Sequence, residues 1–427
     1  MTAFRPARLL ACAVVLAWTA CASDSAPTAS APERPDCAPD NGGLTLPDEF
    51  CAVVVAEGLA MPRHLAVTGN GDVYVALNRS RDGGGGLLAL RDTTGDGRAD
   101  VQVPIDDQGG TGVDLHEDWL YFGRNDAVVR YQLRPGTLAP VAGPEVIVAG
   151  LRAQGGHAAK PVQVTEAGDL FVNIGSPSNS CQQEDRQPGS PGKDPCEERE
   201  RNAGIWRFAA DRPGQTMDDG ERYAAGLRNT VALTHNPLDG ELYGAVHGRD
   251  QLLQNWGELY SAEQSAELPA EEFVRIGRGD DFGWPYCYYD HRQGRRVLAP
   301  EYRGDGSTVG RCSGFEEPLI GFPGHWAPNA LVFYDGDQFP PSYRGGAFIA
   351  FHGSWNRAPL PQEGYNVVFV PRSGDTFGPE WEVFADGFRG PEGGGDHRPT
   401  GLAVGPDGSL YISDDAGGTI WRVMARR

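Results

Sequence analysis

Short apolar segments alternate with polar positions along almost the whole chain, and turns rich in Gly and Asp separate them. In residues 71–76 (Gly-Asp-Val-Tyr-Val-Ala) and 168–172 (Gly-Asp-Leu-Phe-Val), a Gly-Asp turn leads directly into such a segment. Successive side chains of a strand point to opposite faces, so a two-residue period bounded by turns predicts strands joined by hairpins. No amphipathic helix of about 10–15 residues alternates with these strands, which argues against a doubly wound α/β fold.

The strands recur in one repeated unit: a strand, a Gly-Leu or Gly-Phe turn, a second strand, a Gly/Asp turn and a third strand. Four clear copies contain the turns Gly58-Leu59, Gly150-Leu151, Gly226-Leu227 and Gly387-Phe388, and two weaker copies lie around residues 112–122 and 329–349. Several copies end with a fourth alternating strand. Four short strands repeated about every 50 residues are typical of a β-propeller, because each unit buries its faces only against its neighbours. The six copies predict an all-β fold, a six-bladed β-propeller, over residues 47–427.

Composition supports this fold and excludes several functions. Glycine (59) and proline (33) together exceed a fifth of the 427 residues, and both break helices. The formal charge is −21, with 58 acidic and 37 basic residues, so the surface repels phosphate backbones and nucleic acid is not an expected partner. Lys160 and Lys193 are the only lysines. A site that needs fixed cations must therefore use arginine, and a Schiff-base lysine is not expected.

The N-terminal residues have the pattern of an export signal. Arg5 and Arg8 precede an apolar stretch (residues 9–20), which is too short and wrongly flanked for a membrane span. Residues 1–22 are therefore predicted to be a signal peptide that directs the protein to the bacterial periplasm. Cys21 also fits a lipoprotein signal, so a lipid anchor on the outer membrane is the alternative and the only expected membrane contact. Residues 23–46, rich in Ala, Pro, Ser and Asp, are predicted to be a disordered tether.

The cysteines outside the signal suggest disulfide bonds. Of eight cysteines, Cys12 and Cys21 lie in the signal and six remain, an even number in an exported chain. Their spacing favours the neighbouring pairs Cys37–Cys51, Cys181–Cys196 and Cys287–Cys312. Two of these pairs lie in the long insertions that interrupt the repeat, which span residues 176–202, 251–271 and 287–320. Disulfides are therefore expected to hold the longest loops.

The repeat also predicts where one set of loops lies. In each copy the link between the Gly-Leu turn and the next strand should lie at the same end of the propeller, around the central channel. These links contain Arg63 and His64, Gly110 and Thr111, residues 155–157 (Gly-Gly-His), Arg228 and Asn229, His325 and Trp326, and residues 396–398 (Asp-His-Arg). A guanidinium group binds a carboxylate at two points, so converging arginines suit a planar ligand with several carboxylates.

At these positions the chain resembles the soluble glucose/sorbosone dehydrogenases, six-bladed propellers that use pyrroloquinoline quinone (PQQ) and calcium. The resemblance runs from about Phe50 to Val423. Its motifs are Gly156-His157, residues 226–229 (Gly-Leu-Arg-Asn), 282–285 (Phe-Gly-Trp-Pro), 352–357 (His-Gly-Ser-Trp-Asn-Arg) and 398–403 (Arg-Pro-Thr-Gly-Leu-Ala). Each motif is short, but their common order along the chain is specific.

The resemblance implies roles for individual residues. His157 would be the general base that takes the proton of the substrate hydroxyl, a task that suits an unperturbed histidine pKa of about 6.5. Arg228 would lie beside the quinone and Asn229 would hydrogen-bond to it. Arg398 would pair with a cofactor carboxylate, and Arg357 lies near the position where the glucose enzymes use a lysine. Those enzymes have a second cation two residues after Arg398, where this chain has threonine, a difference that bears on cofactor affinity.

Two segments are candidates for calcium. Gly248 and Arg249 match the stretch whose backbone carbonyls bind calcium beside the quinone in the resembling family, and oxygen ligands suit this ion. Residues 92–100 carry alternating oxygen donors as in an EF-hand, but without the closing Glu, so an Asx-rich hairpin turn explains them equally well. Trp284 and Trp355 are expected to be packing residues rather than part of the catalytic site.

Taken with the ring of cations, the resemblance implies a PQQ-dependent dehydrogenase. Its substrate would be an aldose or a sorbosone-like aldehyde, oxidised to a lactone or acid by hydride transfer to the quinone, and an external acceptor would take the electrons. Two other hypotheses stay open. One is a calcium-dependent propeller lactonase or esterase, which needs several acidic and amide side chains around one ion. The other is a non-catalytic binding protein of the cell envelope.

Overall fold

The computed structural model describes Met1 and residues 34–78, 85–390 and 394–426. The predicted signal peptide beyond Met1, with Cys21, and residues 23–33 of the predicted tether lie outside the described residues. Residues from Arg34 onward belong to a single compact unit. Within the described ranges, no helix is long and apolar enough to cross a membrane.

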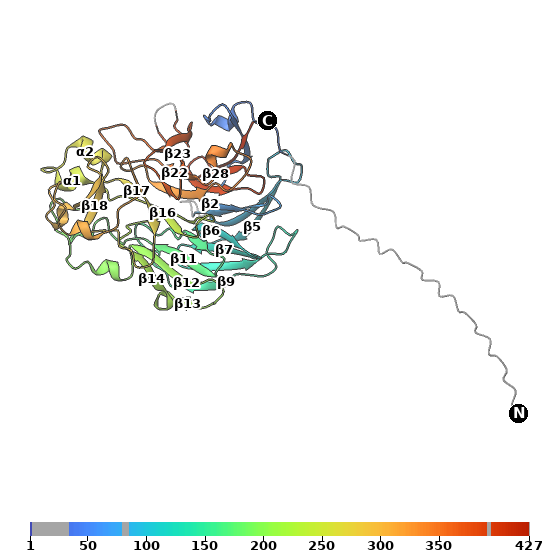
Figure 1. The fold of residues 1–427 in the computed structure, drawn as a ribbon, viewed down its shortest axis with the longest axis horizontal. Coiled ribbons are helices and arrows are strands. Elements are labelled where there is room, and N and C mark those ends of the chain that lie inside the picture. Colours follow the sequence, from blue (N-terminus) through green and yellow to red (C-terminus); the bar gives the residue numbers. More distant parts are fainter. Residues whose placement is uncertain (2–33, 79–84, 391–393, 427) are drawn as a thin grey trace. The chain divides into compact units, whose positions relative to one another are not determined.

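Six antiparallel sheets follow one another along the chain and form the six predicted blades (Figure 1). Blade one contains β2 (Pro62–Val67), β3 (Val73–Leu77), β4 (Gly86–Arg91) and β5 (Val101–Asp106). Blade two contains β6 (Gly110–His116), β7 (Trp119–Arg124), β8 (Val128–Gln132) and β9 (Glu145–Ala149), with the short parallel β13 (Gln215–Thr216) on its edge. Blade three contains β10 (Val162–Val164), β11 (Asp169–Ile174), β12 (Gly204–Ala209) and β14 (Glu221–Ala225).

The second half of the wheel repeats this order. Blade four contains β15 (Ala232–His235), β16 (Leu242–Val246), β17 (Glu271–Ile276) and β20 (Ile320–Phe322). Blade five contains β21 (Pro328–Phe333), β22 (Ala347–His352), β23 (Tyr365–Val370) and β26 (Glu382–Ala385). Blade six contains β27 (Pro399–Val404), β28 (Leu410–Asp414), β29 (Thr419–Ala425) and β1 (Phe50–Ala56). The remaining elements are α1 (Leu252–Trp256), α2 (Ala262–Glu267) and the hairpins of β18 (Cys287–Asp290) with β19 (Arg295–Leu298) and β24 (Arg372–Ser373) with β25 (Thr376–Phe377).

The alternation along each strand assigns its two faces to the two neighbouring blades. In β3, Val73 and Val75 pack into the apolar cluster shared with blade six, whereas Tyr74 and Ala76 pack into the cluster shared with blade two. Because each face is buried only when its neighbour is present, the blades stabilise one another around the ring.

The first strand of the described chain closes the ring. β1 pairs with β29, the third strand of blade six, with Phe50 opposite Ala425. Residues 34–46, which the sequence analysis assigned to a disordered tether, do not behave as one. The Cys37–Cys51 disulfide holds them to β1, Leu44 is buried, and the Trp421 indole donates to the Gly42 carbonyl. Burial of apolar side chains and a covalent link therefore order this segment despite its polar composition.

All three predicted disulfide pairs are present, so the spacing argument was correct. The three long insertions pack together on one side of the wheel, where α1, α2 and β18 lie close to one another (Figure 1). Their shared cluster includes both insertion disulfides together with Leu252, Tyr260 and Trp284. This additional layer stands beside blades three and four and supplies part of the site described next.

Candidate functional site

The innermost strands of the six blades surround the propeller axis, each in contact with the next. At one end of this ring lies a cavity of about 520 Å³. All six predicted links contribute to its lining, through Arg63, Thr111, His157, Arg228, Asn229, His325 and Arg398. The predicted convergence is therefore confirmed for these residues. Two other members of the predicted set, His64 and Trp326, do not line the cavity, because His64 lines a hollow at the other end of the channel and Trp326 packs into the core against Phe351. Gly248 also lines the cavity.

His157 is held in a defined orientation. Its backbone has a φ of +60°, the left-handed region, and Arg152 stabilises this turn by donating to the carbonyls of Gly156 and Gly175 at 3.1 and 2.9 Å. The ring nitrogen Nδ1 lies 2.9 Å from the Ser176 carbonyl. A carbonyl only accepts, so Nδ1 carries the proton and Nε2 keeps a free lone pair.

The electrostatic surroundings keep this imidazole neutral. Burial is the main cause that lowers the pKa of His157 well below its ordinary value, and the nearby cation of Arg228 lowers it further. Both effects disfavour the charged form. His157 is therefore able to accept a proton at neutral pH.

Arg228 is buried in the wall with its guanidinium fully engaged. Its Nε donates to the Asn179 carbonyl at 3.1 Å, Nη1 donates to the Gly248 carbonyl at 2.7 Å, and Nη2 lies 3.1 Å from the Asp250 carboxylate. Asn229 next to it lines the cavity and accepts a hydrogen bond from Asn173 at 3.1 Å. The two residues are thus held rigidly before any ligand enters.

Arg398 differs from the other arginines of the lining. Arg63 pairs with Asp415 at 2.5 Å, and Arg186 and Arg228 share Asp250. Arg398 lies over the Tyr365 ring and 3.3 Å from a His352 nitrogen, and within the described ranges it forms no ion pair. A cation in a cavity without a carboxylate partner is available for an anionic ligand.

Two predicted site residues do not reach the cavity. Arg357 was expected to bind a cofactor, but its buried guanidinium donates to the Ala266 and Gly324 carbonyls and pairs with Glu267. Its length lets it cross behind the cavity wall to α2, so it anchors its own loop instead. The Arg249 side chain also turns away and pairs with Glu301 at 2.6 Å, which leaves only its backbone as a candidate ligand.

The residue two positions after Arg398 is also withdrawn from the cavity. Thr400 is fully buried within β27, and its hydroxyl donates to the Pro62 carbonyl at 2.8 Å. Arg63, the next residue along β2, nevertheless reaches the cavity from this neighbouring strand. A second cation therefore stands near Arg398 even though the sequence has threonine at the expected position.

Sequence reasoning missed two carboxyl groups in the lining. Asp250 accepts from Arg228, Arg186 and Asn356. Burial opposes its ionisation, but Arg228, His325 and Arg186 hold its pKa below the ordinary range. Burial raises the pKa of Glu271 to about 8. Asp250 directly follows the predicted Gly248 and Arg249, so its position beside this motif could have identified it as a lining residue. Glu271 ends an insertion and gave no such signal.

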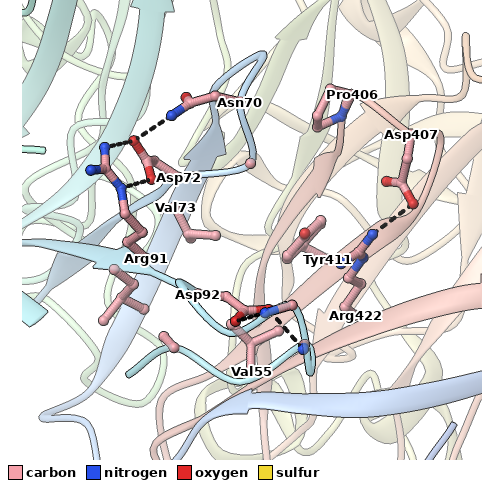
Figure 2. Close-up of a pocket in the computed structure, with 15 residues that line it drawn as sticks. Val55, Asn70, Asp72, Val73, Arg91, Asp92, Pro406, Asp407, Tyr411 and Arg422 are labelled. Carbon is pink, nitrogen blue, oxygen red and sulfur yellow. Dashed lines mark hydrogen bonds and ion pairs between the residues drawn. The ribbon is translucent and has the colours of Figure 1, made fainter. Parts of the chain in front are cut away.

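A second, smaller pocket of about 330 Å³ lies between blades one and six and includes the other calcium candidate (Figure 2). Asp92 accepts backbone hydrogen bonds from Gly95 and Gly97, both at 2.7 Å. The two ion pairs in this view, Arg91–Asp72 and Arg422–Asp407, satisfy the remaining charged groups drawn there. The carboxylate of Asp92 therefore caps the turn between β4 and β5.

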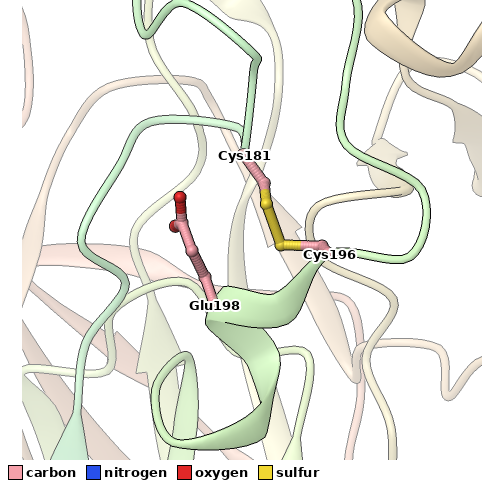
Figure 3. Close-up of side chains that lie close together, drawn as sticks. All are labelled: Cys181, Cys196 and Glu198. Atoms are coloured by element: carbon pink, nitrogen blue, oxygen red, sulfur yellow. A yellow bond between two sulfur atoms is a disulfide. The ribbon is translucent and has the colours of Figure 1, made fainter.

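Within the described ranges, the only cluster of at least three His, Cys, Asp or Glu side chains with metal-site spacing is Cys181, Cys196 and Glu198 (Figure 3). Both sulfur atoms are joined in a disulfide, and the Glu198 carboxylate accepts from Ser178 at 2.6 Å. Thiolates are the metal-binding form of cysteine, so this cluster is structural. Acidic and amide side chains of the kind a calcium lactonase needs do line the main cavity, namely Asp250, Glu271 and several asparagines, but the Asp250 carboxylate is paired with Arg186 and Arg228.

Comparison with known proteins identifies the class. The TrAA12-like family model matches residues 44–426, and the chain belongs to this family. A pyrroloquinoline quinone-dependent pyranose dehydrogenase of Coprinopsis cinerea is 23% identical over 426 aligned positions, which cover 88% of this chain and 54% of that protein. An uncharacterised protein of Borreliella burgdorferi is 28% identical over 48% of each chain. The chain thus spans about half the length of the curated relatives it matches.

Solved structures agree in fold. The holo form of the pyranose dehydrogenase PQQ domain from Coprinopsis cinerea has a TM-score of 0.71 and 21% identity, with 92% of this chain and 98% of that chain covered. The apo-form soluble aldose sugar dehydrogenase of Escherichia coli has a TM-score of 0.58 and 18% identity, with 88% and 100% covered. These similarities confirm the six-bladed propeller.

Proposed function

We propose that this protein is a PQQ-dependent sugar dehydrogenase that oxidises an aldose or a related sugar aldehyde to a lactone or acid. The observation that carries the proposal is the cavity itself, in which a neutral, oriented histidine faces buried arginines. The Coprinopsis cinerea relative, a pyrroloquinoline quinone-dependent pyranose dehydrogenase, supports it, as does family membership.

The lining fits a planar, anionic quinone. Arg398 has no ion pair among the described residues, and the Nε atom of Arg63 is buried without a hydrogen-bond partner. Such a buried donor is costly unless a ligand satisfies it. We expect Arg398 and Arg63 to bind carboxylates of the quinone, with Asn229 and Arg228 beside its ring system. When bound, PQQ supplies the two-electron acceptor for the hydride of the substrate.

We expect His157 to act as the general base in this reaction. Its Nε2 lone pair would accept the proton of the substrate hydroxyl while the carbon of the same group loses hydride. Nδ1 keeps its proton and donates it in a hydrogen bond to the Ser176 carbonyl, which stabilises the imidazolium that forms. Arg152 prevents the His157 turn from relaxing.

Calcium would need more oxygen ligands than the lining residues alone offer. The Gly248 carbonyl already accepts from Arg228, and Asp250 is engaged by two arginines, whereas calcium takes six to eight oxygen ligands. We therefore propose that Gly248 and Arg249 contribute backbone oxygens to calcium only together with ligands from the bound quinone and water.

The proposal includes the setting of the enzyme. The signal pattern favours export to the periplasm, or attachment to the outer membrane through Cys21, and an external acceptor would reoxidise the quinone there. Lipid labelling of the full-length chain, compared with a Cys21→Ala variant, distinguishes the two locations.

A titration of the purified protein tests the proposed function. PQQ is added with calcium or with a chelator, and absorbance reports binding. We expect saturation at one quinone per chain, tighter with calcium, and sugar-dependent dye reduction by the loaded protein. If the wild-type protein binds no quinone and reduces no dye with any aldose, the proposal is wrong and a non-catalytic binding protein becomes the better explanation.

A further inference from the structure

One aromatic side chain at the cavity remains exposed. Trp355 was expected to be a packing residue, but 62% of it is accessible, whereas Trp284 is buried as expected. Among the described lining residues, Trp355 is the only tryptophan, tyrosine or phenylalanine. The rest of the lining is dominated by arginine, histidine and asparagine, so the indole stands out as an apolar surface in a polar cavity.

The loop that carries Trp355 is anchored on both sides. Ser354 is fully buried, its hydroxyl donates to Gln362 at 2.8 Å, and its carbonyl accepts from Tyr365 at 2.6 Å. On the other side, Asn356 donates to Asp250 at 2.9 Å and Arg357 makes the contacts to α2 described above. The backbone of Trp355 is therefore fixed by the hydrogen bonds of its neighbours, and the indole itself forms no hydrogen bond within the described residues.

A large apolar side chain held in water is costly unless a ligand covers it. Because the flanking residues already fix the loop, a ligand that covers Trp355 loses little affinity to loop ordering. The anchoring of an exposed indole at a cavity is thus the arrangement expected of a binding surface.

The quinone and the substrate would bind at different depths in the cavity. The residues that would hold the quinone lie deeper than the indole. Arg228 and Arg63 have side-chain exposures of 5% and 11% and Arg398 is half-buried, whereas Trp355 is mostly exposed. A ligand that enters after the quinone therefore meets the indole. A pyranose ring has a face of C–H groups that packs on an aromatic ring, while its hydroxyls remain free for polar groups.

We propose that Trp355 is the stacking surface for the pyranose ring of the substrate. This inference rests on the proposed function, because it takes the second ligand to be a sugar. Trp355 would then determine how tightly sugars bind, and it would leave both the affinity for PQQ and the proton transfer at His157 unchanged.

The test compares Trp355→Ala, Trp355→Phe and Val383→Ala. Val383 is another exposed apolar side chain, on the outermost strand of blade five and outside the cavity. Binding of 1,5-anhydro-D-glucitol, which lacks the anomeric hydroxyl, is measured by calorimetry on the PQQ-loaded protein, so no turnover is needed. PQQ affinity is measured by absorbance, and KM and kcat by dye reduction.

We expect Trp355→Ala to weaken anhydroglucitol binding and raise KM about tenfold, with kcat and PQQ affinity within about twofold. Trp355→Phe should lie between Ala and wild type, and Val383→Ala should equal wild type. Lower PQQ affinity with unchanged sugar binding would overturn the inference, since the indole would then stack on the quinone. Unchanged values for both ligands would overturn it as well. A wild-type protein that binds no quinone contradicts the proposed function instead, so the two failures are distinguishable.

Discussion

The two ends of the central channel are built from the same six strands but have different chemistry. The cavity of the candidate active site lies where these strands begin. A second hollow of about 280 Å³ is lined by later residues of the same strands, such as Asp114 and Gln163. Arginines line the first, whereas the described lining of the second contains none. The difference follows the chain: links that precede the strands form one end, and the strands themselves form the other.

At the second end the polar groups serve the fold. The Asp114 carboxylate accepts from the Val164 amide at 2.6 Å and from Gln163 at 2.9 Å, and Gln163 in turn accepts from the His235 amide at 3.2 Å. These bonds link the innermost strands of blades two, three and four. The comparison shows that strands preserve the ring, while the links are free to carry reactive groups.

The same substitution at the two ends should give the largest contrast. His157→Ala removes the proposed base, so we expect kcat to fall about a thousandfold with PQQ binding retained. His235→Ala removes a histidine at the other end and should leave kcat unchanged. Stopped-flow reduction of the bound quinone by glucose measures both. If His157→Ala reduces the quinone as fast as the wild type does, the proposed catalytic role of this end of the channel is wrong.

Charge removal should give a smaller contrast. Arg398→Ala should weaken PQQ binding about ten- to a hundredfold, because a charge-assisted hydrogen bond is lost in the cavity. Arg275→Ala makes the same change in net charge at an exposed position of β17 and should leave the affinity unchanged. Absorbance titration at fixed ionic strength measures both variants. Equal losses would show that overall charge, rather than the cavity, binds the quinone.

The smallest effect concerns pH. Proton acceptance needs neutral His157, and acid removes this form as the pH falls through its pKa. Since burial and Arg228 lower that pKa, the acid limb of kcat/KM should lie below the ordinary histidine value of about 6.5. Arg228→Gln removes a nearby cation, so the pKa of His157 should rise. Histidine NMR titration of the quinone-free protein measures this shift without turnover, and a lower pKa in the variant would contradict the assignment.

Repetition made much of this molecule predictable. Because each copy places its link at the same position, His157, Arg228 and Arg398 could be brought together from sequence alone, although they are far apart along the chain. The strand alternation and cysteine spacing similarly predicted the blades and the disulfides. These features depend on local periodicity, which a single sequence shows directly.

Insertions limited the prediction, because their paths depend on tertiary packing rather than on a period. Arg186 reaches the cavity from the first insertion, and Glu271 reaches it from the end of the second. Arg357 lies in a conspicuous motif, yet its side chain turns toward α2, whereas Trp355, two residues earlier, lines the cavity and is exposed. Which neighbour of a motif faces a cavity is decided by such loop contacts, which the sequence pattern does not encode.

The pairing of β1 with β29 gives the ends of this chain an unusual importance. Proteolytic removal of residues up to Ala56 would strip one edge from blade six and expose the backbone groups of β29. Because each blade is buried against its neighbours, this cleavage would destabilise the whole propeller and not only its N-terminal end. The Cys37–Cys51 disulfide holds the N-terminal segment to β1. Reducing agents should therefore make this segment sensitive to proteases before the other blades unfold.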